Sequence, residues 1–373
     1  MKKMLLLCII GFLLTGCNRK EEMSAQGMQH ERTVVDIMGG VVQIRIFDIE
    51  CTDNAQDERN AQDERNARDE RCELLDEAFE MIFDMEKRWT VNDEGGEIQA
   101  INAMAGISPV AVEADTFHLI ERGKHYSIYS DRDFNIAIGP LTSLWNIAMP
   151  EARRPSSAEI EAVLPLLDPT RIILDNEANT VFLQDSGMRL DLGGIAKGFM
   201  LDVIVEFFLE NGVERALLIV GGEVISIGGR NDHTPNRIGV RNPFFKETSH
   251  PDTYLIGNLP IYNQALITSG TYQRFWRNQE TQVAYHHIFN SHTGLPFETD
   301  IVSLSIQADT GLLGEVYTKI LFAKSIEDGL AYVEAQPNIE ALFVRNDGGI
   351  YLSTGFQDNF NFTLQNGEFE IRN

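Results

Sequence analysis

The sequence predicts an α+β fold in a single large domain, with antiparallel sheets interleaved with helices. Two observations support this prediction. Short apolar runs bounded by Gly and Pro alternate with helical patterns, and no long linker interrupts the chain after Trp89. An apolar fraction of 43% over 373 residues is also enough for a substantial core. We therefore expect one domain over residues 33–373.

The domain is predicted to begin with a β-hairpin. We expect a first strand at Thr33–Val35, a turn at Met38-Gly39-Gly40, and a second strand at Val41–Phe47, in which apolar and polar residues alternate. Residues 54–71 then repeat the unit Asn-Ala-Gln-Asp-Glu-Arg, with one change in the third copy. Because six residues advance a helix by about 600°, no apolar face builds up. We interpret this low-complexity insertion as a solvated helical extension, with partner binding as the alternative.

The N-terminus has the layout of a secretory signal peptide that ends in a lipoprotein cleavage site. Lys2-Lys3 precede an apolar run from Met4 to Leu14, which is too short for a permanent membrane-spanning helix. We expect residues 1–16 to be removed, Cys17 to be lipidated, and residues 17–32 to be a polar tether. This predicts an exported protein, lipid-anchored on the periplasmic or cell-surface side of a bacterial membrane. An uncleaved anchor is the alternative.

The net charge argues against nucleic-acid binding, and the positions of the cysteines argue against a disulfide. The formal net charge of −25 would repel the phosphates of nucleic acid, so we expect no nucleic-acid partner. Cys51 and Cys72 are the only cysteines after Cys17. If residues 54–71 are helical, these two cysteines lie roughly 25 Å or more apart, which is too far for a disulfide.

The rest of the domain is predicted to alternate helices with short strands. Helices are expected at Asp115–Tyr129 and at Arg153–Leu167, the latter with Pro155 near its start. Short strands and their Gly or Pro turns are expected at Ala216–Val220, Ile238–Pro243, Ala265–Arg274 and His286–Pro296.

The segment Asp191–Asp202 is the most informative part of the chain, because a strand pattern changes there into a helix pattern. Apolar residues at Val181, Leu183, Met188 and Leu190 predict short strands around a turn. Helical spacing then runs over Ile195, Phe199, Val203 and Phe207 until Asn211-Gly212. Gly193 and Gly194 would therefore precede a helix N-terminus, where free N–H groups attract anions and Lys197 adds positive charge. This favours a phosphate-bearing ligand; a plain tight connection is the alternative.

From Val34 to Phe356 the chain resembles the ApbE family, flavin transferases that move FMN from FAD to a Thr or Ser of a partner protein. Each shared motif is weak alone, but seven occur in the family order. They are Met38-Gly39, Glu97-Ile98 with Asn102, Phe134-Asn135 through Pro140-Leu141 and Trp145, Asp191–Asp202, Gly221-Gly222, Thr268-Ser269-Gly270 with Tyr272, and His287-Ile288 with Thr293-Gly294.

The resemblance assigns roles to individual residues. His287 would take the proton of the incoming hydroxyl, a task suited to a side chain that titrates near neutrality; a structural histidine is the alternative. The carbonyl of Ala196, with Glu315 and Thr318, would hold Mg²⁺. The residues expected to contact FAD are Met38, Asn92, Gly193, Gly194, Lys197, Asp202, Thr268, Ser269 and Gly270.

Several positions depart from the family pattern. Asn135 and Asn290 stand where aspartates are expected. The metal pattern Asp-x-Leu-x-Thr falls on Glu315–Lys319, and a protonated lysine cannot ligate a metal. Either Thr318 replaces the missing hydroxyl, or the Lys319 ammonium occupies the region of the cation and neutralises phosphate. Asn92 replaces a tyrosine, which predicts looser FAD binding and slow hydrolysis to FMN and AMP; a turn residue is the alternative.

The sequence therefore predicts an FAD:protein FMN transferase that uses FAD, and Mg²⁺ if the altered site still binds it. Its acceptor would be a flavoprotein subunit of a membrane redox complex. The alternatives are an FAD pyrophosphatase, a non-catalytic FAD-binding lipoprotein, and a solute-binding lipoprotein that binds no flavin.

Overall fold

The computed structural model describes residues 30–37, 40–48, 73–91, 95–147, 149–230, 232–246, 248–363 and 367–372. The expected signal peptide, Cys17, most of the expected tether and the 54–71 repeat lie outside these ranges. So do Met38, Cys51, Cys72 and Asn92. Within the described ranges, no helix is both long and apolar enough to cross a bilayer.

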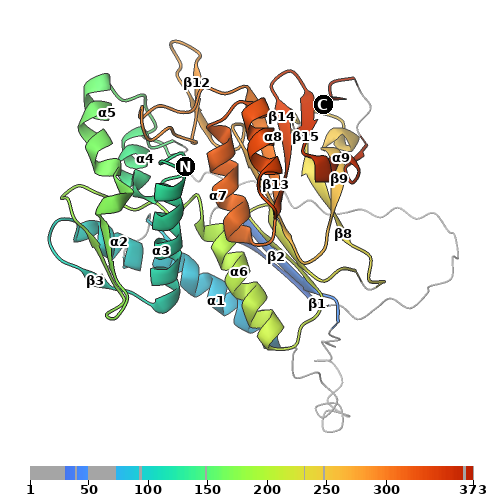
Figure 1. The fold of residues 1–373 in the computed structure, drawn as a ribbon, viewed down its shortest axis with the longest axis horizontal. Helices are drawn as coiled ribbons and strands as arrows, with labels where there is room; N and C mark the ends of the chain where they lie inside the picture. The colour runs from blue at the N-terminus through green and yellow to red at the C-terminus, as the bar shows by residue number, and fades with distance from the viewer. Residues whose placement is uncertain are drawn as a thin grey trace, which may run out of the picture.

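Helices lie in front of a large sheet in the view of Figure 1. The described helices are α1 (Leu74–Trp89), α2 (Glu97–Ala103), α3 (Ala114–Tyr129), α4 (Gly139–Trp145), α5 (Ser157–Val163), α6 (Ala196–Glu210), α7 (Gly311–Phe322), α8 (Ile326–Glu334) and α9 (Thr354–Gln357). Short 3₁₀ turns cover Ile136–Ile138, Leu164–Leu167, Pro169–Arg171 and Pro251–Thr253.

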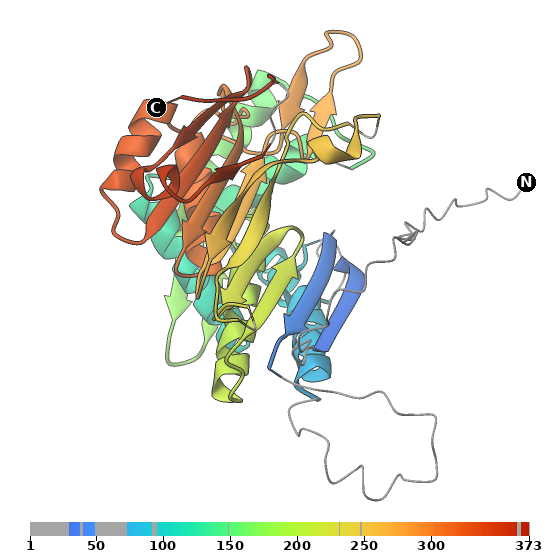
Figure 2. The ribbon, with the colours of Figure 1, turned by 90° about the vertical axis from the view of Figure 1, so that its right-hand side faces the viewer.

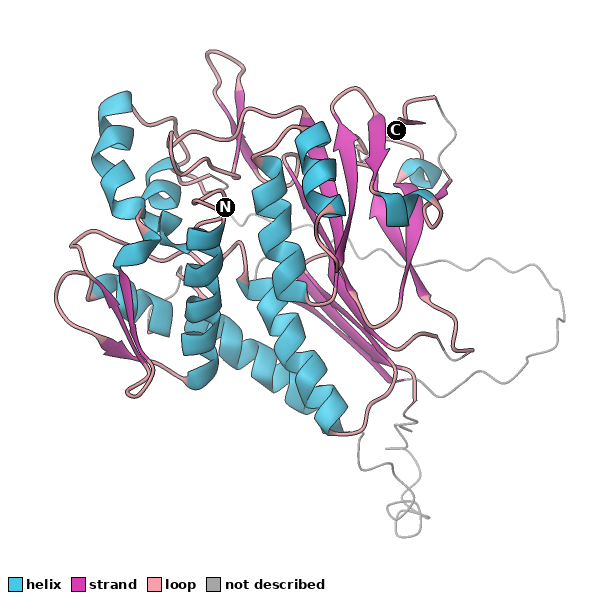
Figure 3. Cartoon of the chain, viewed as in Figure 1, coloured by secondary structure: helices cyan, strands magenta, loops and turns pink. Residues whose placement is uncertain are grey.

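In the described part of the chain, the large sheet has the strand order β1-β2-β6-β7-β10-β13-β14-β15-β17. Figure 3 shows its strands behind the helices. Neighbouring strands are antiparallel except for β15 and β17, which are parallel. The strands of this sheet are β1 (His30–Ile37), β2 (Gly40–Ile46), β6 (Ala216–Val220), β7 (Glu223–Ile227), β10 (Ala265–Gly270), β13 (Ile301–Ala308), β14 (Ile339–Arg345), β15 (Gly349–Leu352) and β17 (Glu370–Ile371).

Smaller sheets complete the fold. One has the order β3-β5-β4, one the order β16-β9-β8, and β11 pairs with β12. Their bounds are β3 (Val110–Ala111), β4 (Ile172–Asp175), β5 (Thr180–Leu183), β8 (Asn236–Arg241), β9 (Leu255–Ile261), β11 (Phe275–Arg277), β12 (Ala284–His286) and β16 (Asn361–Phe362). The predicted α+β class with antiparallel sheets is confirmed, and so are the N-terminal hairpin and the helix at α3.

The large sheet separates two apolar cores, because successive strand residues point to opposite faces. On β14, Ala341 and Phe343 belong to the core beneath the helices, whereas Leu342 and Val344 belong to the core shared with β8 and β9. Figure 2 shows this sheet from the side, with β1 and β2 in blue at one end and the C-terminal strands in red at the other. The helix-covered face is where the polar site described below lies.

Half of the strand pattern before α6 was predicted wrongly. Val181 and Leu183 lie on β5, but Met188 and Leu190 lie in no strand, although both are buried. The side chain of Asn102 supplies the hydrogen bonds that a neighbouring strand would give. Its Nδ2 donates to the Leu190 carbonyl at 3.0 Å, and its Oδ1 accepts the Leu190 N–H at 2.6 Å.

The helix predicted over Arg153–Leu167 is shorter than expected. Ser156 and Glu159 form a capping box, so α5 begins only at Ser157. It ends at Val163, and a 3₁₀ turn that contains Pro165 follows, because proline has no N–H to continue the helix. In the predicted segment Ala265–Arg274 the strand ends at Gly270. In the predicted segment His286–Pro296 only His286 lies in a named strand, since β12 begins at Ala284, and Phe289 and Pro296 form an isolated bridge.

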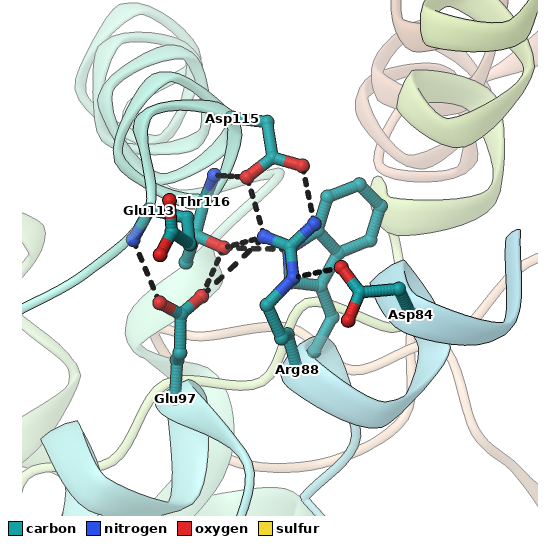
Figure 4. Close-up of polar contacts among 7 residues, drawn as sticks. Asp84, Arg88, Glu97, Glu113, Asp115 and Thr116 are labelled. Atoms are coloured by element: carbon teal, nitrogen blue, oxygen red, sulfur yellow. Dashed lines mark hydrogen bonds and ion pairs between the residues drawn. The ribbon is translucent and has the colours of Figure 1, made fainter. Parts of the chain in front are cut away.

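One partly buried polar network ties α1, α2 and α3 together (Figure 4). Arg88 near the end of α1 donates to both carboxylate oxygens of Asp115 in the first turn of α3, with Nη2–Oδ2 at 2.6 Å. Glu97, the first residue of α2, accepts the backbone N–H of Glu113 at 2.7 Å. The network therefore fixes both ends of the connection from α1 to α2.

Candidate functional site

The turn before α6 is held in place by one carboxylate. Asp191 Oδ1 accepts the N–H of Gly193 at 2.9 Å, and Asp191 Oδ2 accepts the hydroxyl of Thr142 at 2.8 Å. Helix α6 then begins at Ala196, as the sequence predicted, and Ile195 at its N-cap offers no side-chain hydrogen bond. No side chain therefore caps the first turn, although the N–H of Ala196 donates to the carbonyl of Leu192 at 2.9 Å. The remaining N–H groups and the helix dipole favour an anion at this end.

Helices α6 and α7 touch through two glycines. A Cβ atom built on Gly198 would lie 2.3 Å from the carbonyl oxygen of Gly311, so only glycine permits this approach. Asp202 fixes the same junction, because its carboxylate accepts the N–H groups of Gly311 at 2.6 Å and Leu312 at 2.8 Å. Burial raises the pKa of Asp202 to about 7. Both oxygens of Asp202 thus bind the start of α7, so the structure gives this residue a positioning role.

The crossing brings together four charged side chains, Lys197, Glu223, Glu315 and Lys319, which we call the charge quartet. Lys197 Nζ lies 2.8 Å from Glu315 Oε1 and also contacts Glu223. Lys319 Nζ contacts Glu315 Oε2, so each oxygen of Glu315 binds a different ammonium group. The Glu315 side chain is fully buried, whereas those of Lys197 and Lys319 are 19% and 17% exposed. The two lysine side chains are therefore the partly exposed members of the quartet.

The pKa values in the quartet follow from this arrangement. Burial alone would raise the pKa of Glu315, but the Lys197 and Lys319 ammonium groups hold it well below its ordinary value. Burial alone would lower the pKa of Lys197, but Glu223 and Glu315 raise it. Burial and the charge of Glu315 raise the pKa of Glu223 well above its ordinary value. Protonation of Glu223 would leave the quartet with one net positive charge.

Two hydroxyl groups extend the quartet toward β10. Lys319 Nζ donates to Ser269 Oγ at 3.3 Å, and Ser269 Oγ donates to Thr318 Oγ1 at 3.1 Å. Thr318 Oγ1 in turn donates to the carbonyl of Glu315 at 2.7 Å. Thr268 alternates with Ser269 along the strand, and its hydroxyl lies 2.8 Å from that of Ser305 on β13. Of these expected FAD contacts, only Ser269 thus joins the quartet.

Of the glycines that the sequence analysis singled out, Gly194 and Gly221 lie beside the quartet, whereas Gly270 contacts another residue. A Cβ built on Gly194 would lie 3.5 Å from Lys319 Cε, so the predicted turn is beside the quartet. Gly221 lies at the turn between β6 and β7, and a Cβ built on it would lie 3.2 Å from Lys197 Cδ. Gly270 instead makes room for the ring of Tyr272, at 2.3 Å.

His287 follows β12 directly. Its Nδ1 lies 3.0 Å from the carbonyl of Arg274, which can only accept, so Nδ1 carries the proton and Nε2 is left as the basic nitrogen. Burial, with the positive charges of Arg274 and Lys319, lowers the pKa of His287 to about 4. The expectation that this side chain titrates near neutrality is therefore wrong. His286 contacts a different segment, since its Nε2 lies 3.0 Å from the carbonyl of Phe297.

The residues expected to hold Mg²⁺ do not fit a divalent cation. Mg²⁺ requires free oxygen ligands. Both oxygens of Glu315 already bind ammonium groups, and the hydroxyl of Thr318 is occupied by Ser269 and a backbone carbonyl. Ala196 is buried at the first position of α6. Across the described ranges, no group of three or more His, Cys, Asp and Glu residues is arranged to hold a metal.

Sequence reasoning missed Glu223. It follows Gly221-Gly222, which was recognised only as a family marker, and a single glutamate after a turn forms no pattern. In the structure Glu223 is 4% exposed, and its Oε2 has no hydrogen-bond partner among the described residues.

The chain is similar in sequence to proteins of known activity. Over 281 residues the chain is 36% identical to the FAD:protein FMN transferase of Klebsiella pneumoniae (strain 342), a match that covers 75% of this chain and 85% of that protein. It is 29% identical over 297 residues to the protein of the same name from Treponema pallidum (strain Nichols), with 76% and 80% covered.

Solved structures share the fold. The ApbE protein of Thermotoga maritima superposes with a TM-score of 0.74 at 23% identity, covering 89% of this chain and 99% of that one. The flavin transferase ApbE from Vibrio cholerae gives a TM-score of 0.69 at 21% identity, again covering 89% and 99%. Residues 38–343 match the model of the ApbE family. The chain therefore belongs to the ApbE family.

Proposed function

We propose that this chain is an FAD:protein FMN transferase that attaches FMN to a Thr or Ser hydroxyl of an electron-transfer subunit and releases AMP. The observation that carries the proposal is the pair of ammonium groups, Lys197 and Lys319, beside the N-terminus of α6, which no side chain caps. Two cations and a helix N-terminus suit a pyrophosphate. The names of the two relatives, which cover three quarters of the chain, support the same substrate.

The proposed reaction breaks one bond and forms one. The acceptor oxygen bonds to the phosphorus of the FMN half of FAD, while the P–O bond to the AMP half breaks and AMP leaves with the bridging oxygen. Negative charge grows on the leaving phosphate, and fixed positive groups stabilise it most when they are already in place.

His287 is the proposed acceptor of the hydroxyl proton. Its Nδ1–H is held by the carbonyl of Arg274, so the Nε2 lone pair is available. Because the pKa of His287 is lowered to about 4, the ring is neutral at physiological pH and can take a proton as the hydroxyl attacks.

We also propose that the protein is exported and lipid-anchored through Cys17, with residues 1–16 removed and residues 17–32 as the tether. The N-terminal sequence supports this, and an acceptor subunit in a membrane redox complex would then lie within reach of the tether. Metabolic labelling with a radioactive fatty acid checks it. Label in the parent chain that is absent from Cys17→Ser is the expected result, and equal labelling would refute it.

Transfer is tested with the purified chain, FAD, and a subunit that carries a candidate acceptor Thr. The expected result is an acceptor heavier by one FMN, with AMP released in equal amount, and no gain in mass when the acceptor Thr is changed to Val. Release of FMN and AMP without labelled acceptor would identify an FAD pyrophosphatase instead. Bound FAD that remains intact would identify a non-catalytic flavin-binding protein.

A further inference from the structure

The most unusual feature of the site is that a buried carboxylate has both oxygens neutralised by lysines from two helices. Lys197 comes from the first turn of α6, and Lys319 lies one helical turn after Glu315 on α7. A lysine and a glutamate four residues apart on an exposed helix contribute little. Here Glu315 is fully buried, and Lys319 is also held by Ser269 at 3.3 Å, so its ammonium has a fixed position.

That position is beside backbone that a ligand can approach. Gly194 lies next to Lys319, and Gly221 lies next to Lys197. The side chains of Lys197 and Lys319 are 19% and 17% exposed, whereas those of Glu223 and Glu315 are 6% and 0% exposed. The lysine side chains therefore lie nearer to the surface than the carboxylates, on the side from which an anion would reach the α6 N-terminus.

We propose that the ammonium groups of Lys319 and Lys197 supply the positive charge that a divalent cation would otherwise provide, so that this chain binds FAD and transfers FMN without a metal ion. The inference rests on the proposed function for the transfer step. It identifies Lys319 as the residue that neutralises the pyrophosphate while the P–O bond to AMP breaks and the acceptor O–P bond forms. No additional reactant is required, because the hydroxyl proton passes to His287.

The first experiment uses the unchanged chain after EDTA treatment and exchange into metal-free buffer. FAD affinity is measured by quenching of flavin fluorescence, with and without added Mg²⁺, and binding of Mn²⁺ is followed by its electron paramagnetic resonance signal. We expect the FAD dissociation constant to agree within about twofold in the two buffers and no stoichiometric Mn²⁺ site to form. An increase in FAD affinity of tenfold or more on adding Mg²⁺, or one tightly bound Mn²⁺ per chain, would overturn the inference.

The second experiment tests the lysine. Lys319→Met should weaken FAD binding about ten- to a hundredfold, the equivalent of one charge-assisted hydrogen bond. Lys324→Met is the matched control, since Lys324 lies just beyond α7 and its Nζ is 3.6 Å from Asp133 Oδ2, outside the quartet. This control should bind FAD as the parent does. Equal FAD affinity in Lys319→Met and the parent would contradict the role of Lys319.

The two proposals fail in different ways. FAD binding that is independent of metal and dependent on Lys319, without any labelled acceptor, would refute the transferase function and leave the metal-free site intact. Transfer that stops in EDTA and returns with Mg²⁺ would refute the metal-free site and leave the transferase function intact. The double variant Glu315→Asp with Lys319→Thr should show Mg²⁺-dependent FAD binding, because it exchanges the ammonium for a hydroxyl ligand.

Discussion

The contact between α6 and α7 gives the sharpest test of how the fold builds the site. In Gly198→Ala, the new Cβ would lie 2.3 Å from the carbonyl oxygen of Gly311 and 2.8 Å from Cγ of Glu315. An ordinary C···O contact is about 3.3 Å, so the two helices must separate by about 1 Å. The same shift stretches the 2.8 Å contact between Lys197 and Glu315 to about 3.8 Å, beyond hydrogen-bonding distance.

Two opposing contributions decide the stability of this variant. Overpacking of a close contact costs about 1–3 kcal/mol, while alanine is favoured over glycine inside a helix by up to about 1 kcal/mol. We expect the free energy of unfolding of Gly198→Ala to fall by about 1–2 kcal/mol, with weaker FAD binding. Urea denaturation followed by circular dichroism and FAD titration by fluorescence measure the two effects.

Gly194→Ala is the matched control. Its Cβ would meet only Lys319 Cε at 3.5 Å and Phe134 Cε2 at 3.6 Å, which are ordinary contacts. Its free energy of unfolding should therefore stay within about 0.5 kcal/mol of the parent, while the added methyl group reduces FAD affinity by blocking the turn. If Gly198→Ala proves as stable as Gly194→Ala, the helices do not meet at glycine and this account of the crossing is wrong.

Further predictions concern four ionisable side chains. Glu315→Gln should lower the free energy of unfolding by about 3–5 kcal/mol, since it leaves two ammonium groups around a neutral buried side chain. Glu223→Gln should cost clearly less, because the pKa of Glu223 is already raised; equal losses in urea denaturation would contradict this. His287→Ala should retain FAD but lower the transfer rate about 10²-fold. In the parent chain the transfer rate should rise with pH through about 4 and then stay level, because the pKa of His287 is lowered to about 4. A midpoint of this pH profile near 6.5 would count against His287 as the base. The pKa of Asp202 is about 7 in the folded chain, which exceeds its value in the unfolded chain. Between these two values the folded chain keeps a proton on Asp202 that the unfolded chain loses. The stability that this proton contributes is therefore complete below pH 4 and is lost as the pH rises to about 7. Asp202→Asn should remove that pH dependence and cost about 1–3 kcal/mol, because its amide nitrogen cannot accept the second N–H of α7; an unchanged pH profile of stability would refute the assignment.

Local patterns predicted the parts of the fold that depend on local interactions. The alternation in Val41–Phe47 identified the hairpin, and the helical spacing after Ile195 placed α6 with the correct end at Asn211. Met188 and Leu190 were placed wrongly because an apolar residue at every second position describes a strand and a buried extended segment equally well. Asn102, which decides between them, lies 88 residues away in the sequence.

The site shows the same limit. Gly193, Gly194 and Lys197 were identified because a strand-to-helix junction has a recognisable composition. The charge quartet was not predicted as a unit, since Lys197 and Glu315 are 118 residues apart and the packing of α6 against α7 brings them together. The low pKa of His287 was missed for a similar reason: sequence shows the residue type, but burial and the charge of Lys319 depend on tertiary structure.

The register between β2 and β6 sets a condition on the order in which the chain folds. Val42 pairs with Val220 and Ile46 with Ala216, so α1 to α6 are all synthesised between the two strands. Until β6 emerges, β2 has an unpaired edge and an apolar face formed by Val42, Ile44 and Ile46. Closing so long a loop is slow compared with forming a local hairpin. Fragments that end before residue 216 are therefore expected to aggregate rather than fold.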